Sequence, residues 1–314
     1  MLAPICLFVY NRPDHTKKVL EYLSKNKEAV ESILYIFCDG PPQNSESSLI
    51  EQINSTRNII RSENRFKQVI IVERDKNSGL SKSIIQGVTE VLKKHTKVIV
   101  LEDDLLVSST FLSFMNTSLE KYCHHQTIGA ICGFMYPISL NDSVKDTFLL
   151  DYNSCWGWGT WEDRWKLFDD DGSRLLNKIT KLGLSDKFDL DNTVPHLRML
   201  KNQILGINNS WAIRWAASLF VENKFSLFPK FSLVKNIGFD GSGIHSGTDN
   251  FYNVELYENL IHVTDNLIEE ENQVKEKLKH FFKNLKIQRT LKRIKRILAS
   301  GPIYAIRKIV KRYK

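Results

Sequence analysis

The segment Lys97–Asp104, KVIVLEDD, joins an apolar run to three consecutive acidic residues. Its β-branched residues predict a buried strand over Lys97–Leu101, with Glu102, Asp103 and Asp104 at the carboxyl end. Adjacent carboxylates repel one another and are costly to desolvate without a cation. Such hard oxygen ligands suit Mg²⁺ or Mn²⁺, which can bridge a diphosphate. A solvated acidic turn or a helix N-terminus would also account for these residues.

Apolar, strand-like runs alternate with helix-like segments throughout the first third of the chain. The expected strands before Lys97 are Pro4–Tyr10, Ser32–Cys38 and Gln68–Glu73, and the expected helices are Asp14–Lys27, Ser47–Ser62 and Leu80–Lys94. This alternation predicts a parallel sheet with right-handed crossovers. Ligands of such sheets lie beyond the carboxyl ends of the strands, where Asp39, Arg74 and Asp75 also fall.

Three further segments contain candidate binding residues. Residues 74–83 follow a strand and open a helix, so the helix N-terminus and Lys82 favour an anion such as phosphate. Ordinary helix capping by Ser81 is the simpler interpretation. Arg214 could pair with a diphosphate or an acceptor, or it could form a buried ion pair. His245 lies in a glycine-rich loop, where it could bind a metal or a phosphate.

The segment Cys155–Trp165, CWGWGTWEDRW, interleaves glycines with tryptophans. Glycine permits close backbone approach, and indole faces stack well on sugar C–H surfaces and on other flat apolar groups. A hydrophobic core rarely alternates the two residue types in this way. We therefore predict that this segment, Trp158 included, forms the wall of a binding site, with a place in the hydrophobic core as the alternative.

Composition is that of a globular protein, with 42% hydrophobic and 25% charged residues in a chain of 314. No apolar run reaches the roughly 20 residues that span a bilayer. Ile5–Tyr10 is short and follows no basic segment, so it predicts a strand and not a signal peptide. Five cysteines without a C-x-x-C spacing favour free thiols in a reducing compartment. We expect a cytoplasmic protein.

Positive charge is concentrated at the end of the chain. Residues 275–314 hold 15 Lys and Arg and one acid, a net charge of +14, which leaves −6 for the rest. Apolar spacing predicts two short amphipathic helices there, interrupted at 300–302. Such a tail favours an anionic membrane surface as partner. Nucleic acid bound by the tail, or a solvated hairpin packed on the body, would also fit. The acidic body argues against nucleic acid across its main face, and we predict no nucleic-acid partner.

Four motifs, taken in chain order, resemble those of glycosyltransferases with the GT-A fold. Pro4–Pro13 resembles the opening strand of glycosyltransferase family 2. Leu101–Leu105 resembles the acidic D-x-D-type motif, and its E-D-D form is also that of the N-acetylglucosaminyltransferase I family. Trp156–Trp161 and Asn236–His245 resemble later motifs of bacterial family-2-like sugar transferases. The resemblance covers about Ala3–Asp249.

The resemblance implies a nucleotide-diphosphosugar donor, most often a UDP-sugar, together with Mn²⁺ or Mg²⁺. Asp39 would contact the base or ribose, and Asp103 would lie near the ribose or the donor sugar. Asp104 and His245 would hold the metal. The other residues expected to bind the donor are Asn11, Arg12, Asn77, Gly79, Ser83, Glu102, Trp158 and Arg214.

One departure from the resemblance concerns the catalytic base. Related inverting enzymes carry an acidic residue near the second pair of tryptophans, where Ala212 and Ile213 stand here. An inverting transfer needs a carboxylate within hydrogen-bond reach of the acceptor hydroxyl. We expect Asp240 to be this base, or else the pair Glu162 and Asp163. A retaining outcome and a loss of activity both stay open.

We therefore predict an α/β GT-A domain over residues 1–265, with a Rossmann-like, mostly parallel central sheet. A nucleotide-binding half would span 1–107, an acceptor half 108–265, and a basic helical tail 266–314. The expected activity is inverting, metal-dependent transfer of a hexose to a glycan or lipid-linked acceptor in cell-surface polysaccharide synthesis, at the inner face of the cell membrane. The alternatives are a nucleotidyltransferase and a non-catalytic membrane-surface protein on a decayed transferase scaffold.

Overall fold

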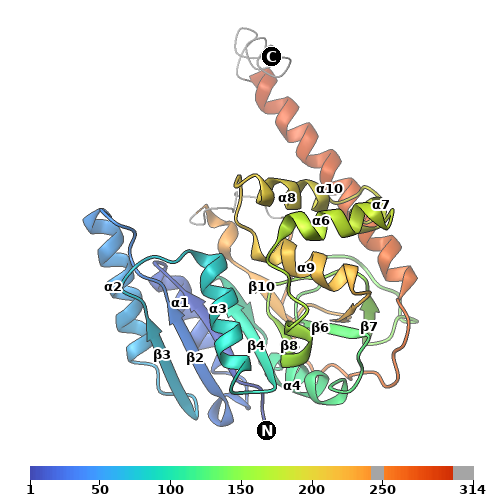
Figure 1. The fold of residues 1–314 in the computed structure, drawn as a ribbon. Coiled ribbons are helices and arrows are strands. Elements are labelled where there is room, and N and C mark those ends of the chain that lie inside the picture. Colours follow the sequence, from blue (N-terminus) through green and yellow to red (C-terminus); the bar gives the residue numbers. More distant parts are fainter. Residues whose placement is uncertain (242–250, 300–314) are drawn as a thin grey trace.

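An eight-stranded sheet organises the chain in the order β3-β2-β1-β4-β8-β6-β9-β7, with helices on both faces (Figure 1). The structure is a computed structural model that describes residues 1–241 and 251–299. β5 and β10 form a separate two-stranded sheet. The strands are β1 Ile5–Val9, β2 Ile33–Cys38, β3 Gln68–Glu73, β4 Lys97–Glu102, β5 Leu105–Val107, β6 Ile128–Cys132, β7 Thr147–Leu150, β8 Trp158–Trp161, β9 Phe225–Pro229 and β10 Val234–Asn236.

Parallel pairing predominates in the large sheet. It joins β1 to β2 and β4, β2 to β3, and β6 to β9, whereas β8 is antiparallel to β4 and β6, and β7 is antiparallel to β9. The predicted α/β class with a mostly parallel central sheet is confirmed. Residues 1–107 supply β1 to β4, and strands from the following part of the chain continue the same sheet.

Helices cover the sheet at the positions that the strand–helix alternation predicts. Pro13 begins α1, because proline suits the first helical position, where its missing N–H is not needed. The helices are α1 Pro13–Leu23, α2 Ser47–Arg61, α3 Leu80–Leu92, α4 Phe111–Lys121, α5 Glu162–Trp165, α6 Gly172–Lys181, α7 Ser185–Phe188, α8 His196–Ile204, α9 Trp211–Val221 and α10 Asn272–Ala299, with short 3-10 turns η1 Ala29–Glu31 and η2 Gly238–Asp240.

Alternate side chains of the central strands enter two cores, one on each face of the sheet. Ile5 and Leu7 of β1 belong to the core that includes residues of α1 and α4. Cys6 and Phe8 belong to the other core, which includes residues of α3 and α9. Every residue of β1 is buried, as expected for a parallel strand between two helical layers. Polar side chains, those of Asn11 and Arg12, follow where this strand ends.

The described part of the basic tail is one helix, α10, which covers the first of the two predicted helices. The second predicted helix falls in residues 300–314, which lie outside the described residues. Among residues 1–241 and 251–299, no helix is both long and apolar enough to cross a membrane. The first half of α10 is buried in a cluster with residues of β7 and β9, through Val274, Leu278, Phe282 and Leu285.

Candidate active site

Arg12 links the end of β1 to the acidic residues at the end of β4. The two strands are parallel neighbours, so the chain leaves the sheet at the same edge after each of them. There, Arg12 Nη2 lies 2.7 Å from Asp103 Oδ1, and Arg12 Nη1 lies 3.2 Å from Asp104 Oδ2. A guanidinium thus supplies positive charge to the acidic cluster. Arg12 was predicted to contact the donor, but the sequence did not reveal this role as a counter-ion.

Burial raises the pKa of two carboxyl groups in the acidic cluster, those of Glu102 and Asp103. Burial raises the pKa of Glu102, and the neighbouring Asp104 and Asp103 raise it further. Burial also raises the pKa of Asp103, although Arg12 opposes this shift. Burial acts to lower the pKa of Arg12, but Asp103 and Asp104 outweigh it, so this pKa is raised. The cluster therefore favours additional positive charge nearby.

The turn after β10 brings Asp240 to the same edge. β10 pairs with β5, the strand that directly follows the acidic residues, and the Ile237 N–H donates to the Asp104 carbonyl at 2.9 Å. In the next turn, η2, Asp240 Oδ2 lies 3.2 Å from His15 Nε2 of α1. His15 was not predicted. Its spacing of three residues from Arg12, one helical turn, is the sequence signal that could have indicated it.

Gly238 lies so close to Asp104 that the effect of adding one methyl group at this glycine can be predicted. A Cβ at Gly238 would lie 2.3 Å from Asp104 Oδ2. We expect Gly238→Ala to push this carboxylate away from Arg12 and to lower the free energy of unfolding by about 1–2 kcal/mol, measured by urea denaturation. The loss should nearly vanish when alanine also replaces Asp104. An equal loss in both backgrounds would contradict the steric explanation.

The carboxylate of Asp39 holds the neighbouring loop in place. It accepts hydrogen bonds from the backbone N–H groups of Gly40, Ser78 and Gly79, at 2.8–3.0 Å. Asn77 Nδ2 donates to the Gly40 carbonyl at 3.0 Å. Together these bonds fix the loop between β3 and α3 beside the end of β2. Contact of Asp39 with a base or ribose stays a prediction.

Arg214 of α9 reaches the N-terminus of α3. Its Nη2 donates to Ser81 Oγ at 2.6 Å, and its other described hydrogen bonds go to the backbone carbonyls of Ser210 and Asp170. Burial lowers the pKa of Arg214, and Asp170 opposes the shift. The guanidinium is thus held mainly by neutral acceptors beside a helix N-terminus, a setting that favours an anion.

The predicted metal ligands are only partly described. His245 lies outside the described residues, and residues 1–241 and 251–299 contain no group of three His, Cys, Asp or Glu side chains that could hold a metal ion. Asp104 is partly exposed and could supply one carboxylate to a cation held mainly by phosphate oxygens. Of the other predicted donor contacts, Asn11 donates to Gln52 at 3.1 Å and Ser83 is buried in α3.

Trp158 belongs to the core, so its predicted place in a site wall is wrong. Its side chain is 1% exposed and packs against Trp165, Trp211 and Trp215. The next residue, Gly159, faces the other side of the sheet, where a Cβ would meet a backbone oxygen at 2.9 Å. The alternation of glycine and tryptophan therefore follows from the two faces of strand β8. The large side chain of Trp158 lies on one face, and on the other face Gly159 allows neighbouring atoms to pack closely.

Trp156, in contrast, lies beside the turn η2. Its ring contacts Phe239 of that turn and Tyr252, with centroid distances of 5.7 and 5.5 Å. Phe134 packs edge-on against the same indole at 4.6 Å. Phe239 directly follows Gly238, so Trp156, two residues before the predicted Trp158, packs against the turn that approaches Asp104.

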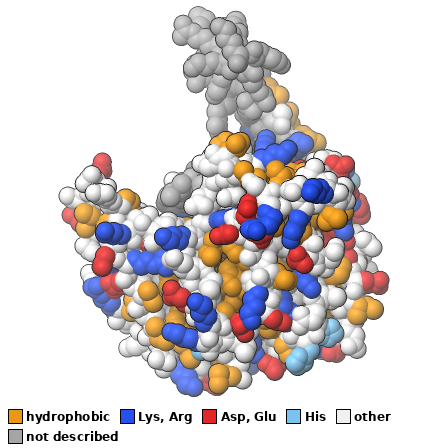
Figure 2. Space-filling model, viewed as in Figure 1, with side chains coloured by type: hydrophobic (Ala, Val, Ile, Leu, Met, Phe, Trp, Pro, Cys, Tyr) orange, Lys and Arg blue, Asp and Glu red, His pale blue; other side chains and the backbone are white. Residues whose placement is uncertain are grey.

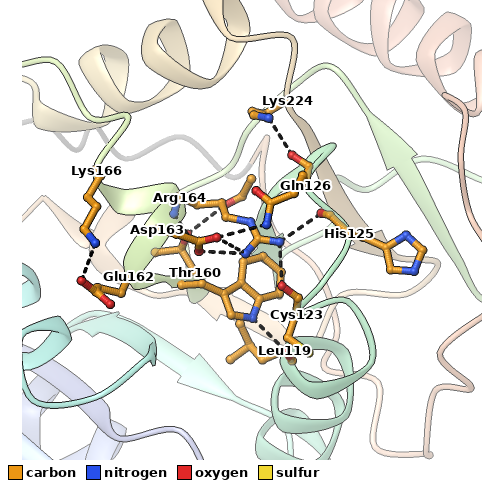
Figure 3. A network of polar contacts seen from close by, with 12 residues as sticks. Leu119, Cys123, His125, Gln126, Thr160, Glu162, Asp163, Arg164, Lys166 and Lys224 are labelled. Atoms are coloured by element: carbon orange, nitrogen blue, oxygen red, sulfur yellow. Dashed lines mark hydrogen bonds and ion pairs between the residues drawn. The ribbon is translucent and has the colours of Figure 1, made fainter.

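Glu162 and Asp163 lie at the wrong edge of the sheet to act at the acidic cluster. β8 is antiparallel to β4, and its last residue is opposite the first residue of β4, so both acids follow at the amino end of that strand. Figure 3 shows Asp163 directed toward Arg164 and Gln126, and Glu162 toward Lys166. Their predicted role as catalytic base is therefore wrong, because the whole length of β4 separates them from Asp104.

No family model and no curated protein matches this chain. Similar solved structures include TarS from S. aureus, with 15% sequence identity over 54% of this chain and a TM-score of 0.35. They also include UDP-glucose pyrophosphorylase in complex with UDP-glucose, with 14% identity over 74% of this chain and a TM-score of 0.38. The matches span 30% of the length of the TarS chain and 91% of the pyrophosphorylase chain. Similarities this distant assign no family.

Proposed function

We propose that this chain is a metal-dependent glycosyltransferase of the GT-A type. It would move a hexose from a nucleotide-diphosphosugar, first of all a UDP-sugar, to a glycan or lipid-linked acceptor in cell-surface polysaccharide synthesis. The observation that carries the proposal is the meeting of Arg12, Asp104 and Asp240 at one edge of the sheet. They come from three motifs far apart in the sequence, and each motif resembles part of a sugar transferase. The carboxyl edge of parallel strands is also where α/β proteins bind nucleotides.

Each residue at this edge suits one part of an inverting transfer. Asp104 would hold Mn²⁺ or Mg²⁺ together with the diphosphate, and the cation would supply charge to the departing group. Arg12 adds a second positive charge beside it. Asp240, 46% exposed and next to His15, is the proposed base that takes the acceptor proton. Trp156 offers an aromatic face near the turn that carries Asp240.

Thermal unfolding in the presence of UDP, GDP, CDP and TDP, each with and without Mn²⁺, tests the proposal. A ligand present at a hundred times its Kd stabilises the folded state by about 2.7 kcal/mol. We expect stabilisation by one nucleoside diphosphate that requires Mn²⁺. Product analysis with the matching nucleotide-sugar should then show release of a nucleoside diphosphate. Stabilisation by none of the nucleotides, or release of pyrophosphate, would contradict the proposal.

A further inference from the structure

Helix α10 has two halves with different surroundings. Along the first half, Val274, Leu278, Phe282 and Leu285 are at most 6% exposed and pack in the cluster that includes β7 and β9. Lys275 reinforces the attachment through ion pairs with Asp151 at 2.7 Å and Glu270 at 2.9 Å. The C-terminal end of α10 projects past the rest of the body (Figure 1). The second half is thus an extension held on a firmly packed base.

A second apolar stripe runs along the projecting half. Ile287, Leu291 and Ile294 are 57%, 51% and 46% exposed. At about 100° per residue, these three positions lie within roughly 60° of one another and nearly opposite Leu278 and Leu285. The helix therefore has one apolar side that is buried on the body and another, on its opposite side, that faces solvent.

Three cation–π contacts show which side of the projecting half faces the body. Arg289 lies over the rings of Phe251 and Tyr252, at 5.9 and 5.7 Å, and Lys292 lies over Phe251 at 4.4 Å. Positions 289 and 292 are on the same side of the helix as the buried positions 278 and 285. Ile287 therefore points away from the body, as do the other two members of the stripe.

Basic residues surround this stripe, whereas the rest of the protein carries mixed charge. No acidic residue follows Glu276 in the sequence, and residues 283–296 contain seven Lys and Arg. Described members of this group on the projecting half are exposed, including Lys286 and Lys295. On the face of the body in Figure 2, Lys and Arg side chains are interspersed with Asp and Glu. The projecting half thus combines solvent-facing apolar side chains with charge of a single sign.

We propose that the solvent-facing stripe of α10, Ile287, Leu291 and Ile294, docks on an anionic lipid surface. Apolar side chains can enter the acyl boundary while the flanking cations contact lipid phosphates, and an amphipathic helix with a basic polar face has the composition for this mode of binding. A second copy of the chain fits less well, because two helices of like charge would repel. Nucleic acid would use the cations but would leave the apolar stripe in water. The proposal does not depend on the proposed enzymatic function.

Co-sedimentation of the full chain with vesicles tests the proposal. One vesicle preparation contains phosphatidylcholine alone, and the other contains equal parts phosphatidylcholine and phosphatidylglycerol. We expect binding to the anionic vesicles only, and weaker binding at high salt. The triple variant Ile287→Ser, Leu291→Ser, Ile294→Ser should bind at least about tenfold more weakly, although its charge is unchanged. The variant Lys286→Gln, Lys295→Gln should also lose affinity.

Matched measurements separate this partner from the others. Val30 is 66% exposed on the turn η1, so Val30→Ser is a control that removes an exposed apolar side chain elsewhere and should bind vesicles normally. Unchanged thermal unfolding of the triple variant would show that it is folded. Equal vesicle binding by the triple variant and the native chain would overturn the proposal. Failure of the native chain to bind vesicles would also overturn the proposal. Binding of duplex RNA in its place would indicate a nucleic-acid partner, and a dimer that the triple variant abolishes would indicate a second copy of the chain.

Discussion

Replacing Asp104 with alanine is expected to lower metal-dependent sugar transfer by about 10³-fold or more. Among the acidic residues of the cluster, Asp104 has a partly exposed carboxylate, whereas Asp103 is 4% exposed. Loss of Asp104 would remove the protein ligand of the cation, and with it much of the charge that stabilises a departing diphosphate. Initial rates of nucleoside diphosphate release, measured over a range of Mn²⁺ concentrations, would detect the loss.

Two controls accompany this variant: a measurement of its stability and a substitution of a distant acidic residue. Asp104→Ala should remain folded, because it removes one of several mutually repelling carboxylates. Glu162→Gln should keep native activity, since Glu162 pairs with Lys166 at the opposite edge of the sheet. Native activity in Asp104→Ala would contradict the assignment of Asp104 as a metal ligand. An equal loss of activity in Glu162→Gln would indicate that the acidic cluster is not the reaction centre.

The position of the acidic cluster could be predicted because it follows from topology. Alternating strands and helices imply parallel pairing, and parallel neighbours must end at the same edge, so Asn11 and Arg12 had to approach Glu102 to Asp104. The pairing of Arg12 with Asp103 and Asp104 could not be predicted, because it depends on the side-chain conformation of one arginine at the start of α1.

The errors concern the part of the sheet that departs from simple alternation. β8 enters antiparallel between β4 and β6, and this reversal sends Glu162 and Asp163 to the amino edge of β4. It also turns Trp158 inward against Trp211 and Trp215. Local composition does not determine strand direction, so the motif could not show where Trp158, Glu162 and Asp163 would lie.

Arg12→Ala is expected to destabilise the protein by about 2–4 kcal/mol. Removing one partner of a largely buried ion pair leaves the other charges uncompensated, although the 22% exposure of the Arg12 side chain reduces the cost below that of a fully buried pair. Adding Asp103→Asn to this variant should restore much of the lost stability, because this second substitution removes the unpaired buried carboxylate. Arg174→Ala, which breaks an exposed pair with Asp169, should leave the free energy of unfolding nearly unchanged.

Mn²⁺ should stabilise Arg12→Ala more than it stabilises the native chain. In the native structure the guanidinium already contacts both Asp103 and Asp104, so a cation gains less from the same carboxylates. Without Arg12 both carboxylates are available to the metal, and part of the lost stability should return as Mn²⁺ is added. Urea unfolding at several Mn²⁺ concentrations would measure the difference. Equal stabilisation of the two proteins would mean that Arg12 and the metal do not share a site, and that charge compensation by Arg12 is purely structural.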